Sequence, residues 1–172
     1  MRSVRYGVAM SLDGYIAGPN GEADWIVHDP DIDFAEIFSR FDTLLIGRRT
    51  YEAMQKGGGG PTPGVALYVI SRTMRQADHP DLAIVADVEA FVKKLKGEPG
   101  KDIWVFGGGE LFRSLLSAGL VDGVDAAIVP VLLGAGIPML PSPATRARLT
   151  LKTRRVYEKS GIVSLQYDVV QG

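Results

Sequence analysis

The stretch KDIWVFGGGELFRSLLSAGL, residues 101–120, decides the fold of this chain. Its residues 103–106 are all apolar, which is typical of a short strand buried on both faces. Three glycines follow at once, and then leucine and phenylalanine side chains recur at the offsets that place them on one helix face. Gly119 is a natural C-terminal stop for that helix. The stretch therefore predicts a strand, a glycine turn and a helix, in that order.

The glycine turn predicts an anion site. Glycines let backbone N–H groups come close to a ligand, and a helix start adds a positive dipole end and unpaired N–H donors. This arrangement favours a phosphate or a diphosphate, although the glycines are equally compatible with a tight turn that binds nothing. The chain has no GxxxxGK[ST] motif and no early GxGxxG motif, so neither a triphosphate P-loop nor the usual dinucleotide fingerprint is predicted.

Length and composition limit the classes of protein to which this chain can belong. The 172 residues, 46% of them hydrophobic, are enough for one domain, residues 1–172, with a single sizeable core. The net charge of −1 combines 19 basic with 20 acidic residues and no basic block, so nucleic acid and anionic membranes are not expected partners. The chain has no cysteine, and its two histidines, His28 and His79, lie far apart, so no metal site is predicted. No apolar run approaches the roughly 20 residues that cross a bilayer, and the N-terminus lacks a signal-peptide segment, so we expect a cytoplasmic protein.

Strands alternate with helices along most of the chain. Alternation or short apolar runs predict strands at residues 4–10, 43–46, 65–70, 82–85, 103–106 and 126–131, and a C-terminal hairpin of residues 149–153 and 163–169. Helices are predicted from residues 29–31 to Phe41, after Gly47, after Asp87 and over residues 111–120, while residues 133–138 form a turn-rich link. This pattern predicts a three-layer α/β/α fold with a mixed, mostly parallel sheet and a C-terminal antiparallel hairpin.

Anion-binding residues follow three of these strands. Parallel strands bring their carboxyl ends to one edge of a sheet, so we expect these residues to line one cleft. They are Gly47, Arg48, Arg49 and Thr50 after one strand, Ser71, Arg72 and Thr73 after the next, and Gly107, Gly108, Gly109 and Glu110 in the central unit. Backbone donors, guanidinium groups and hydroxyls together favour a dinucleotide with an extra phosphate, although exposed arginines at a helix start are also ordinary.

Five motifs, in this order and at these spacings, resemble the dihydrofolate-reductase-like superfamily: MSLDGYIAGPNGEADW, LLIGRRTYE, VISRT, IWVFGGGELF and VPVLLGAGIPML. Within it the chain is most similar to the C-terminal reductase domain of the riboflavin-pathway deaminase-reductases, including its free-standing relatives. The resemblance implies NADPH lying across the carboxyl ends of the strands. It also implies hydride transfer to an imine-like pyrimidine or pterin, as in 5-amino-6-(5-phosphoribosylamino)uracil reductase, and a homodimer, for which residues 129–133 offer an apolar contact surface.

The resemblance assigns cofactor contacts to individual positions. Gly107, Gly108, Gly109, Glu110 and Leu111 match the family's diphosphate loop, and Gly47, Arg48, Arg49 and Thr50 match its second phosphate-binding turn. Ser71, Arg72 and Thr73 match the segment that meets the adenosine 2′-phosphate, and Ala9, Met10 and Ile16 match the stretch beside the nicotinamide. The chain departs from true dihydrofolate reductases at the substrate, because its first helix offers no clear match to their single pteridine-binding carboxylate.

The proton donor and the substrate contacts stay open. Asp33 is our first candidate for the acid and Asp13 the second, although Asp13 also fits a turn and Asp33 a helix start. Trp25 is predicted either to close over the substrate or to anchor its own loop. Three alternatives remain: a dihydrofolate reductase, a non-catalytic nucleotide sensor, and an oligomerising scaffold built on the Pro- and Gly-rich residues 129–143.

Overall fold

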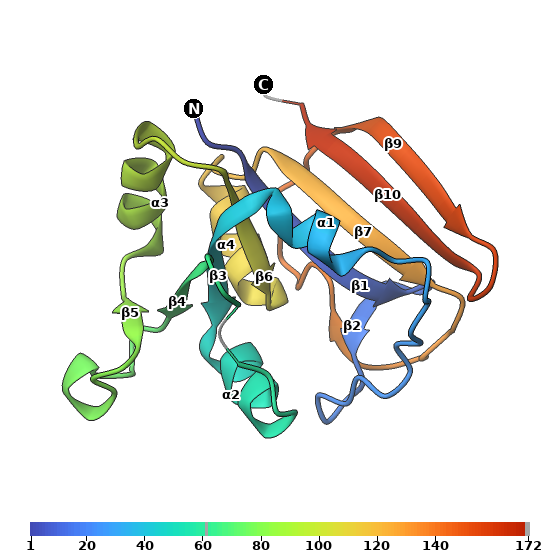
Figure 1. Ribbon diagram of the computed structural model, residues 1–172, viewed down its shortest axis with the longest axis horizontal. Helices are drawn as coiled ribbons and strands as arrows, with labels where there is room; N and C mark the ends of the chain where they lie inside the picture. The colour runs from blue at the N-terminus through green and yellow to red at the C-terminus, as the bar shows by residue number, and fades with distance from the viewer. Residues whose placement is uncertain (61, 171–172) are drawn as a thin grey trace.

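The central strand–glycine–helix unit is present as predicted (Figure 1). The computed structural model describes residues 1–60 and 62–170. Strand β6 spans Asp102–Gly107 and helix α4 spans Gly109–Ser117, so the helix begins and ends slightly earlier than predicted. Gly119 has a φ of 68°, the left-handed conformation that commonly follows a helix end. The predicted stop at this glycine is therefore confirmed.

The described residues contain one sheet of eight strands in the order β5-β4-β3-β6-β1-β7-β10-β9 (Figure 1). The six strands from β5 to β7 run parallel, β10 is antiparallel to its neighbour β7, and β9 is antiparallel to β10. The strands besides β6 are β1 (Val4–Ser11), β3 (Phe41–Gly47), β4 (Ala66–Ile70), β5 (Ala83–Val85), β7 (Gly123–Val129), β9 (Leu149–Tyr157) and β10 (Ile162–Val169). The predicted mixed, mostly parallel sheet with a C-terminal hairpin is confirmed.

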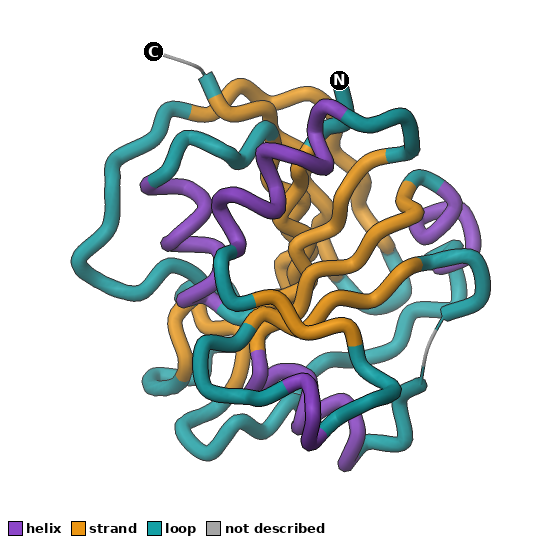
Figure 2. The backbone as a smooth tube through the Cα atoms, turned by 90° about the vertical axis from the view of Figure 1, so that its left-hand side faces the viewer, coloured by secondary structure: helices purple, strands orange, loops and turns teal. Residues whose placement is uncertain are grey.

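Helices cover both faces of the sheet (Figure 2). Successive side chains of each strand point to opposite faces, so a fully apolar strand such as β6 contributes to the core on both sides. On one face, Ile103 and Val105 join the large core formed with α3 (Val88–Gly97) and α4. On the other face, Trp104 packs with Phe41, Leu44 and the aromatic and aliphatic side chains of α1 (Phe34–Ser39). The remaining helices are α2 (Arg48–Lys56) and the short 3₁₀ turn η1 (Gln76–Asp78). No helix in the described part of the chain is both long and apolar enough to span a membrane.

Helix α1 is shorter than predicted. The sequence pattern predicts a helix from residues 29–31 to Phe41, whereas α1 begins at Phe34 and ends at Ser39. The fully buried Asp29 carboxylate accepts hydrogen bonds from the backbone N–H groups of Asp31, at 2.8 Å, and Ser160, at 3.0 Å. These bonds hold residues 29–31 in a turn beside the distant hairpin. A long-range contact therefore overrides the local helix signal.

A second, two-stranded sheet was not predicted. Strand β2 (Tyr15–Ala17) pairs antiparallel with β8 (Ile137–Pro138), inside the link that the sequence pattern left without structure. A backbone hydrogen bond of 2.9 Å from Met139 N–H to the Gly14 carbonyl continues this contact. The pairing fixes the loop after β1 against the segment after β7, and both β2 and β8 contribute residues to the cleft described below.

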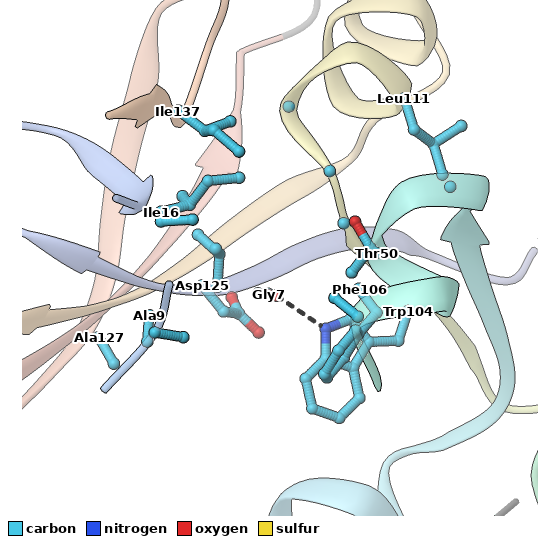
Figure 3. A pocket seen from close by; sticks show the side chains of 18 of the residues that line it. Gly7, Ala9, Ile16, Thr50, Trp104, Phe106, Leu111, Asp125, Ala127 and Ile137 are labelled. Atoms are coloured by element: carbon cyan, nitrogen blue, oxygen red, sulfur yellow. Dashed lines mark hydrogen bonds between the residues drawn. The ribbon is translucent and has the colours of Figure 1, made fainter. Parts of the chain in front are cut away.

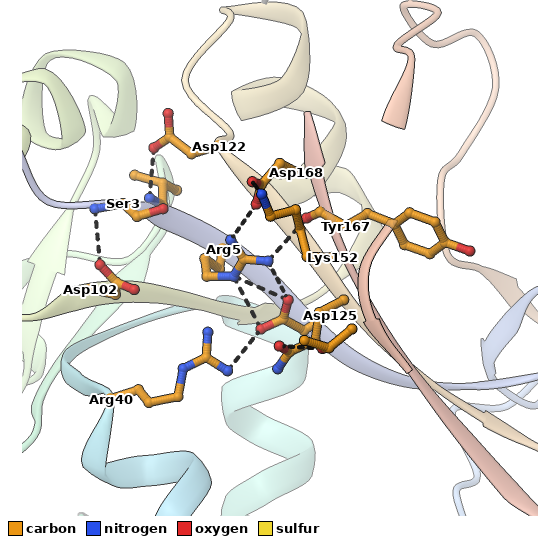
Figure 4. Close-up of polar contacts among 12 residues, drawn as sticks. Ser3, Arg5, Arg40, Asp102, Asp122, Asp125, Lys152, Tyr167 and Asp168 are labelled. Carbon is orange, nitrogen blue, oxygen red and sulfur yellow. Dashed lines mark hydrogen bonds and ion pairs between the residues drawn. The ribbon is translucent and has the colours of Figure 1, made fainter. Parts of the chain in front are cut away.

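A buried arginine joins the two halves of the sheet (Figure 4). Arg5, on the central strand β1, is only 8% exposed. Its Nη2 donates to Asp125 Oδ1 at 2.6 Å and to the Tyr167 carbonyl at 3.0 Å, and its Nη1 donates to Asp168 Oδ1 at 3.1 Å. Arg40, from the end of α1, lies 3.5 Å from the second oxygen of Asp125. This network ties β1 to β7 and β10.

Candidate active site

A long cleft runs along the carboxyl ends of the parallel strands. Its volume of about 2460 Å³ exceeds the roughly 300–1,000 Å³ of a typical ligand pocket, so a dinucleotide and a substrate fit together. All three predicted strand-end segments line it. These residues are Gly47, Arg48, Arg49, Thr50, Ser71, Arg72, Thr73, Gly107, Gly108, Gly109, Glu110 and Leu111. The parallel topology thus brings together side chains and backbone groups that lie far apart in the sequence.

Two helix starts in the cleft lack a side-chain cap. Gly47 precedes α2 and Gly108 precedes α4, and neither glycine can cap the N–H groups of the first turn. By contrast, Asp33 caps α1 and Asp87 caps α3 with their carboxylates. The two uncapped starts are neighbours, since a Cβ atom added to Gly47 would lie 3.4 Å from the Gly108 amide nitrogen. Adjacent, uncapped N–H donors fit the two phosphates of a diphosphate.

An arginine and two hydroxyl groups connect the ends of β3 and β4. Arg48 Nη1 donates to Thr73 Oγ1 at 3.2 Å, and Arg48 Nε donates to Glu52 Oε1 at 2.8 Å. The hydrogen bond from Arg48 lowers the pKa of Glu52. The Ser71 hydroxyl accepts a 3.0 Å hydrogen bond from the Met74 N–H, which orders the turn. Arg72 is exposed on this turn and lines the cleft, so a second guanidinium is available to an anion.

The predicted nicotinamide stretch divides between two faces. Ala9 and Ile16 line the cleft (Figure 3), but Met10 is not among the lining residues. The reason is the period of a strand, because Met10 follows Ala9 directly and points to the opposite face. Direct contact between the Met10 side chain and a ligand in the cleft is therefore not expected.

The half of the cleft beyond β1 contains residues that the sequence pattern did not single out. Asp125, on β7, lines it (Figure 3). Arg40 and Trp104, the latter on β6 at the other side of β1, also line the cleft and were not singled out. The floor continues over polar side chains of β9 and β10: Thr153, Arg155, Ser164 and Gln166. The sequence pattern starts this strand at Ala126, so Asp125 was assigned to the preceding turn. A charged residue alternating with Val124 and Ala126 was the signal that the strand begins earlier.

Asp33, our first candidate for the proton donor, has a structural role. Its carboxylate accepts a 2.9 Å hydrogen bond from the Glu36 N–H and caps α1. It does not line the cleft. The structure thus favours the helix-start role, and a direct proton transfer from Asp33 is not supported.

A pair of substitutions separates the two roles of Asp33. Asp33→Ala is expected to lower the free energy of unfolding by about 1 kcal/mol, because the cap is lost, whereas Asp33→Asn retains a good cap. Urea denaturation of both variants measures this difference. Asp33→Asn is also expected to leave turnover unchanged, and a large fall in turnover with unchanged cofactor affinity would restore the catalytic assignment.

Asp13, the second candidate, fastens two loops together. Its carboxylate accepts hydrogen bonds from the Ser11 hydroxyl at 2.7 Å and from the N–H groups of Leu133 and Gly134 at 3.1 and 2.8 Å. These hydrogen bonds lower the pKa of Asp13, and the bond from the Ser11 hydroxyl has the largest effect. A carboxyl group with a lowered pKa is ionised at neutral pH, so it holds no proton to donate. Asp13 is likewise absent from the cleft lining.

Trp25 anchors its own loop, one of the two predicted possibilities. The ring packs against the small core of Val129, Tyr157 and Ile162, and its Nε1 donates to the Glu22 carbonyl at 3.1 Å. Trp25 does not line the cleft. A second aromatic residue, Trp104, is the one that borders it. Among the described residues, no three His, Asp or Glu side chains gather in a way that would hold a metal ion.

The profile of the RibD C-terminal domain matches residues 2–163, which is nearly the whole chain. The chain belongs to the RibD C-terminal domain family. The resemblance found in the sequence motifs is therefore confirmed. A family relative of Bacillus subtilis strain 168, the uncharacterized protein YyaP, is 34% identical over 178 aligned positions, which cover 96% of this chain and 94% of YyaP.

Solved structures show the same fold as this member of the RibD C-terminal domain family. A provisionally named riboflavin biosynthesis protein from Shewanella sp. PV-4 superposes with a TM-score of 0.83 at 23% identity, covering 98% of this chain and 99% of that one. Dihydrofolate reductase from Enterococcus faecalis, complexed with NADP(H), superposes with a TM-score of 0.70 at 17% identity, covering 98% and 97%. The dihydrofolate-reductase-like fold is thus confirmed.

Proposed function

We propose that this chain is an NADPH-dependent reductase that transfers a hydride to an imine-like carbon of a pyrimidine- or pterin-type substrate. The observation that carries this proposal is that three strand ends with potential anion-binding groups lie in one cleft. Two of these strand ends are followed directly by helices whose first N–H groups have no side-chain cap. The family membership supports a reductase of this kind. The enterococcal structure of the same fold, which holds NADP(H), supports the choice of a nicotinamide cofactor.

The chain's residues fit the two ends of such a cofactor. The starts of α2 and α4 would hold the diphosphate through backbone N–H groups, and Arg72 with the hydroxyls of Ser71 and Thr73 would hold the 2′-phosphate. Ala9 and Ile16 would border the nicotinamide, which supplies the hydride when NADPH is bound.

The protein's own task is to position the substrate and to limit its contact with water. Apolar side chains of α1 and β6, including Ile37, Trp104 and Phe106, line the wall that faces β7 and would cover one face of a flat ring. Because the carboxylates of Asp13 and Asp33 are committed to other hydrogen bonds, we propose water as the source of the proton.

Steady-state oxidation of NADPH tests the proposal. The substrates to compare are the ribosylamino-pyrimidine of the riboflavin pathway and dihydrofolate, with loss of the reduced-nicotinamide absorbance as the readout. Oxidation with either substrate supports a reductase. Tight NADPH binding with no oxidation by any pyrimidine or pterin would favour the nucleotide sensor, and absence of NADPH binding would overturn the proposal.

We also infer that the protein forms a homodimer. Val129 is buried at 2% exposure and cannot contribute to the predicted contact, but Leu132 is 70% exposed. Leu12 is 62% exposed and lies beside it, since the Leu12 N–H donates to the Val131 carbonyl at 2.9 Å. Two neighbouring exposed leucines offer an apolar patch to a second copy.

Sedimentation at micromolar protein tests the dimer. Leu132→Asp is expected to weaken it at least about tenfold, because an unpaired carboxylate would be buried at the contact. Asp24→Asn, an exposed change elsewhere in the chain, serves as the control. A single 18.5 kDa species for the unmodified protein would contradict the inference.

A further inference from the structure

Strand β9 is a long edge of the sheet, and no described strand pairs with its outer side (Figure 1). The strand at the opposite edge, β5, has three residues, whereas β9 has nine. An edge strand presents unpaired backbone N–H and C=O groups, and a very short edge is one way in which proteins avoid unwanted pairing. All of residues 142–156 are exposed. The outer side of β9 is therefore open to a further strand.

A β-bulge divides this edge into two parts. The ladder between β9 and β10 shifts register between Gln166 and Tyr167, which leaves Lys152 as the additional residue of β9. Because a bulge interrupts regular pairing, an added strand fits best along the regular part, residues 153–157. This length lies within the usual range of strands. Only Tyr157, at its end, is buried.

The segment around β9 is strongly basic. Residues 146–157 contain five basic side chains and no acidic one, whereas the whole chain has a net charge of −1. The five are Arg146, Arg148, Lys152, Arg154 and Arg155, and all are exposed. The nearly equal totals of basic and acidic residues conceal this local excess. A strand that pairs with β9 is therefore favoured when it is acidic.

The two arginines on the regular part of the edge keep their charge available. Among the described residues, no carboxylate forms an ion pair with Arg154 or Arg155, and the Asp31 carboxylate nearby is paired with Lys159 at 2.8 Å. The Arg155 guanidinium lies 4.8 Å from the centroid of the Tyr157 ring and donates to the Asp31 carbonyl at 3.4 Å. Neither contact neutralises the charge, so both guanidinium groups can bind a carboxylate.

Apolar side chains lie on the same edge. The register with β10 places Leu151, Arg154 and Val156 on one face of the hairpin and Thr153 with Arg155 on the other. Leu151 and Val156 are 47% and 53% exposed. Charged side chains on an edge can serve only to prevent strand pairing, but that role does not require exposed apolar neighbours. The mixture of charged and apolar side chains instead favours recognition of a particular strand.

Two other occupants fit this edge less well. In an antiparallel contact between two copies of β9 centred on Arg154, or between Arg154 and Arg155, basic residues would lie opposite basic residues. Like charges directly opposite one another destabilise such a pair. Nucleic acid is usually bound by basic residues clustered on one face, whereas Arg154 and Arg155 lie on opposite faces of the strand.

We propose that β9 binds an extended acidic segment of another protein, which adds a further strand to the sheet. Backbone hydrogen bonds along residues 153–157 hold the segment, and its side chains determine which segment is bound. Opposite Arg154 and Arg155 the segment carries two consecutive carboxylates, and opposite Val156 it carries a branched apolar residue.

Amide hydrogen exchange of the full chain tests this proposal with the capped peptide Thr-Val-Glu-Glu-Val-Thr, which reads the same in both directions. Exchange at residues 153–157 is expected to slow when the peptide is added, because outward N–H groups gain partners. Arg154→Gln and Arg155→Gln are each expected to weaken peptide binding about tenfold, since one charge-assisted hydrogen bond is lost. Lys93→Gln, an exposed change on α3, is the control and should alter the affinity less than about twofold.

Two altered peptides separate backbone pairing from simple charge attraction. Glutamine in place of both glutamates is expected to weaken binding at least about tenfold. Methylation of every backbone nitrogen keeps the carboxylates but removes the N–H donors, and it is expected to weaken binding at least as much. The midpoint of urea denaturation, measured on each protein variant, shows that the fold is retained.

Four results would overturn the proposal. They are absence of peptide binding at about millimolar concentration, equal binding of the methylated peptide, an unchanged affinity in both arginine variants, and stronger protection of the same amides by single-stranded oligothymidylate. Protection of residues 153–157 that rises with protein concentration in the absence of peptide would also overturn it, in favour of a second copy. None of these measurements uses NADPH, and their result is independent of the proposed function.

Discussion

The unmodified protein is expected to bind NADPH about a hundredfold more tightly than NADH. Both cofactors carry the diphosphate, so the uncapped starts of α2 and α4 cannot distinguish them. The 2′-phosphate adds a charge of nearly −2, and each charge-assisted hydrogen bond to it contributes about 1.5–3 kcal/mol. Two such bonds, from Arg72 and a neighbouring hydroxyl, account for a hundredfold difference.

Arg72→Ala is expected to reduce this preference to about tenfold, because one of the two bonds is lost. Added salt should weaken NADPH more than NADH, since it screens the additional charge. Arg75→Ala is the control, because Arg75 is paired with Asp78 at 3.0 Å and does not line the cleft. Titrations of each variant with both cofactors, at two salt concentrations, measure these effects. Equal affinities in the unmodified protein would contradict the role assigned to residues 71–73.

The second large effect concerns stability. Arg5→Met is expected to lower the free energy of unfolding by about 3 kcal/mol, because it leaves Asp125 and Asp168 without their buried partner. The double variant Arg5→Met/Asp125→Leu is expected to recover at least about half of the loss, since an apolar pair replaces the broken ion pair. Lys94→Met, which breaks the exposed pair with Glu98, should change stability by less than about 1 kcal/mol.

Urea denaturation at constant ionic strength measures all three variants. If Arg5→Met lowers the free energy of unfolding by less than about 1 kcal/mol, the buried network contributes no more to stability than a surface ion pair does. A double variant less stable than Arg5→Met would show that the site does not accept apolar side chains.

Most of the fold was predictable because its signals are local. Apolar runs, alternation and glycines mark β1, β6, α4 and the C-terminal hairpin within windows of about ten residues. The strand-end segments of the cleft followed from topology, since parallel strands bring their carboxyl ends to one edge.

The features of the fold and of the site that the sequence did not predict depend on contacts between distant residues. Strands β2 and β8 are too short to show a period, and they form only because each meets the other. The start of α1 moved to Phe34 because Asp29 binds the backbone of Ser160 in the hairpin. Asp125 was missed as a cleft residue because the alternation of Val124, Asp125 and Ala126 is a weak strand signal, which the pairing of β7 with β1 makes plain.

The position of β1 has a consequence for how the chain folds during synthesis. This strand precedes the other strands of the sheet in the sequence, yet it lies in the middle of the sheet, between β6 and β7. Both of its hydrogen-bonded neighbours belong to residues 102–129, so β1 must wait until well over half of the chain has left the ribosome. Such long-range pairing slows folding and leaves apolar strands exposed for longer. The nascent chain is therefore expected to depend on chaperone protection until β7 has been synthesised.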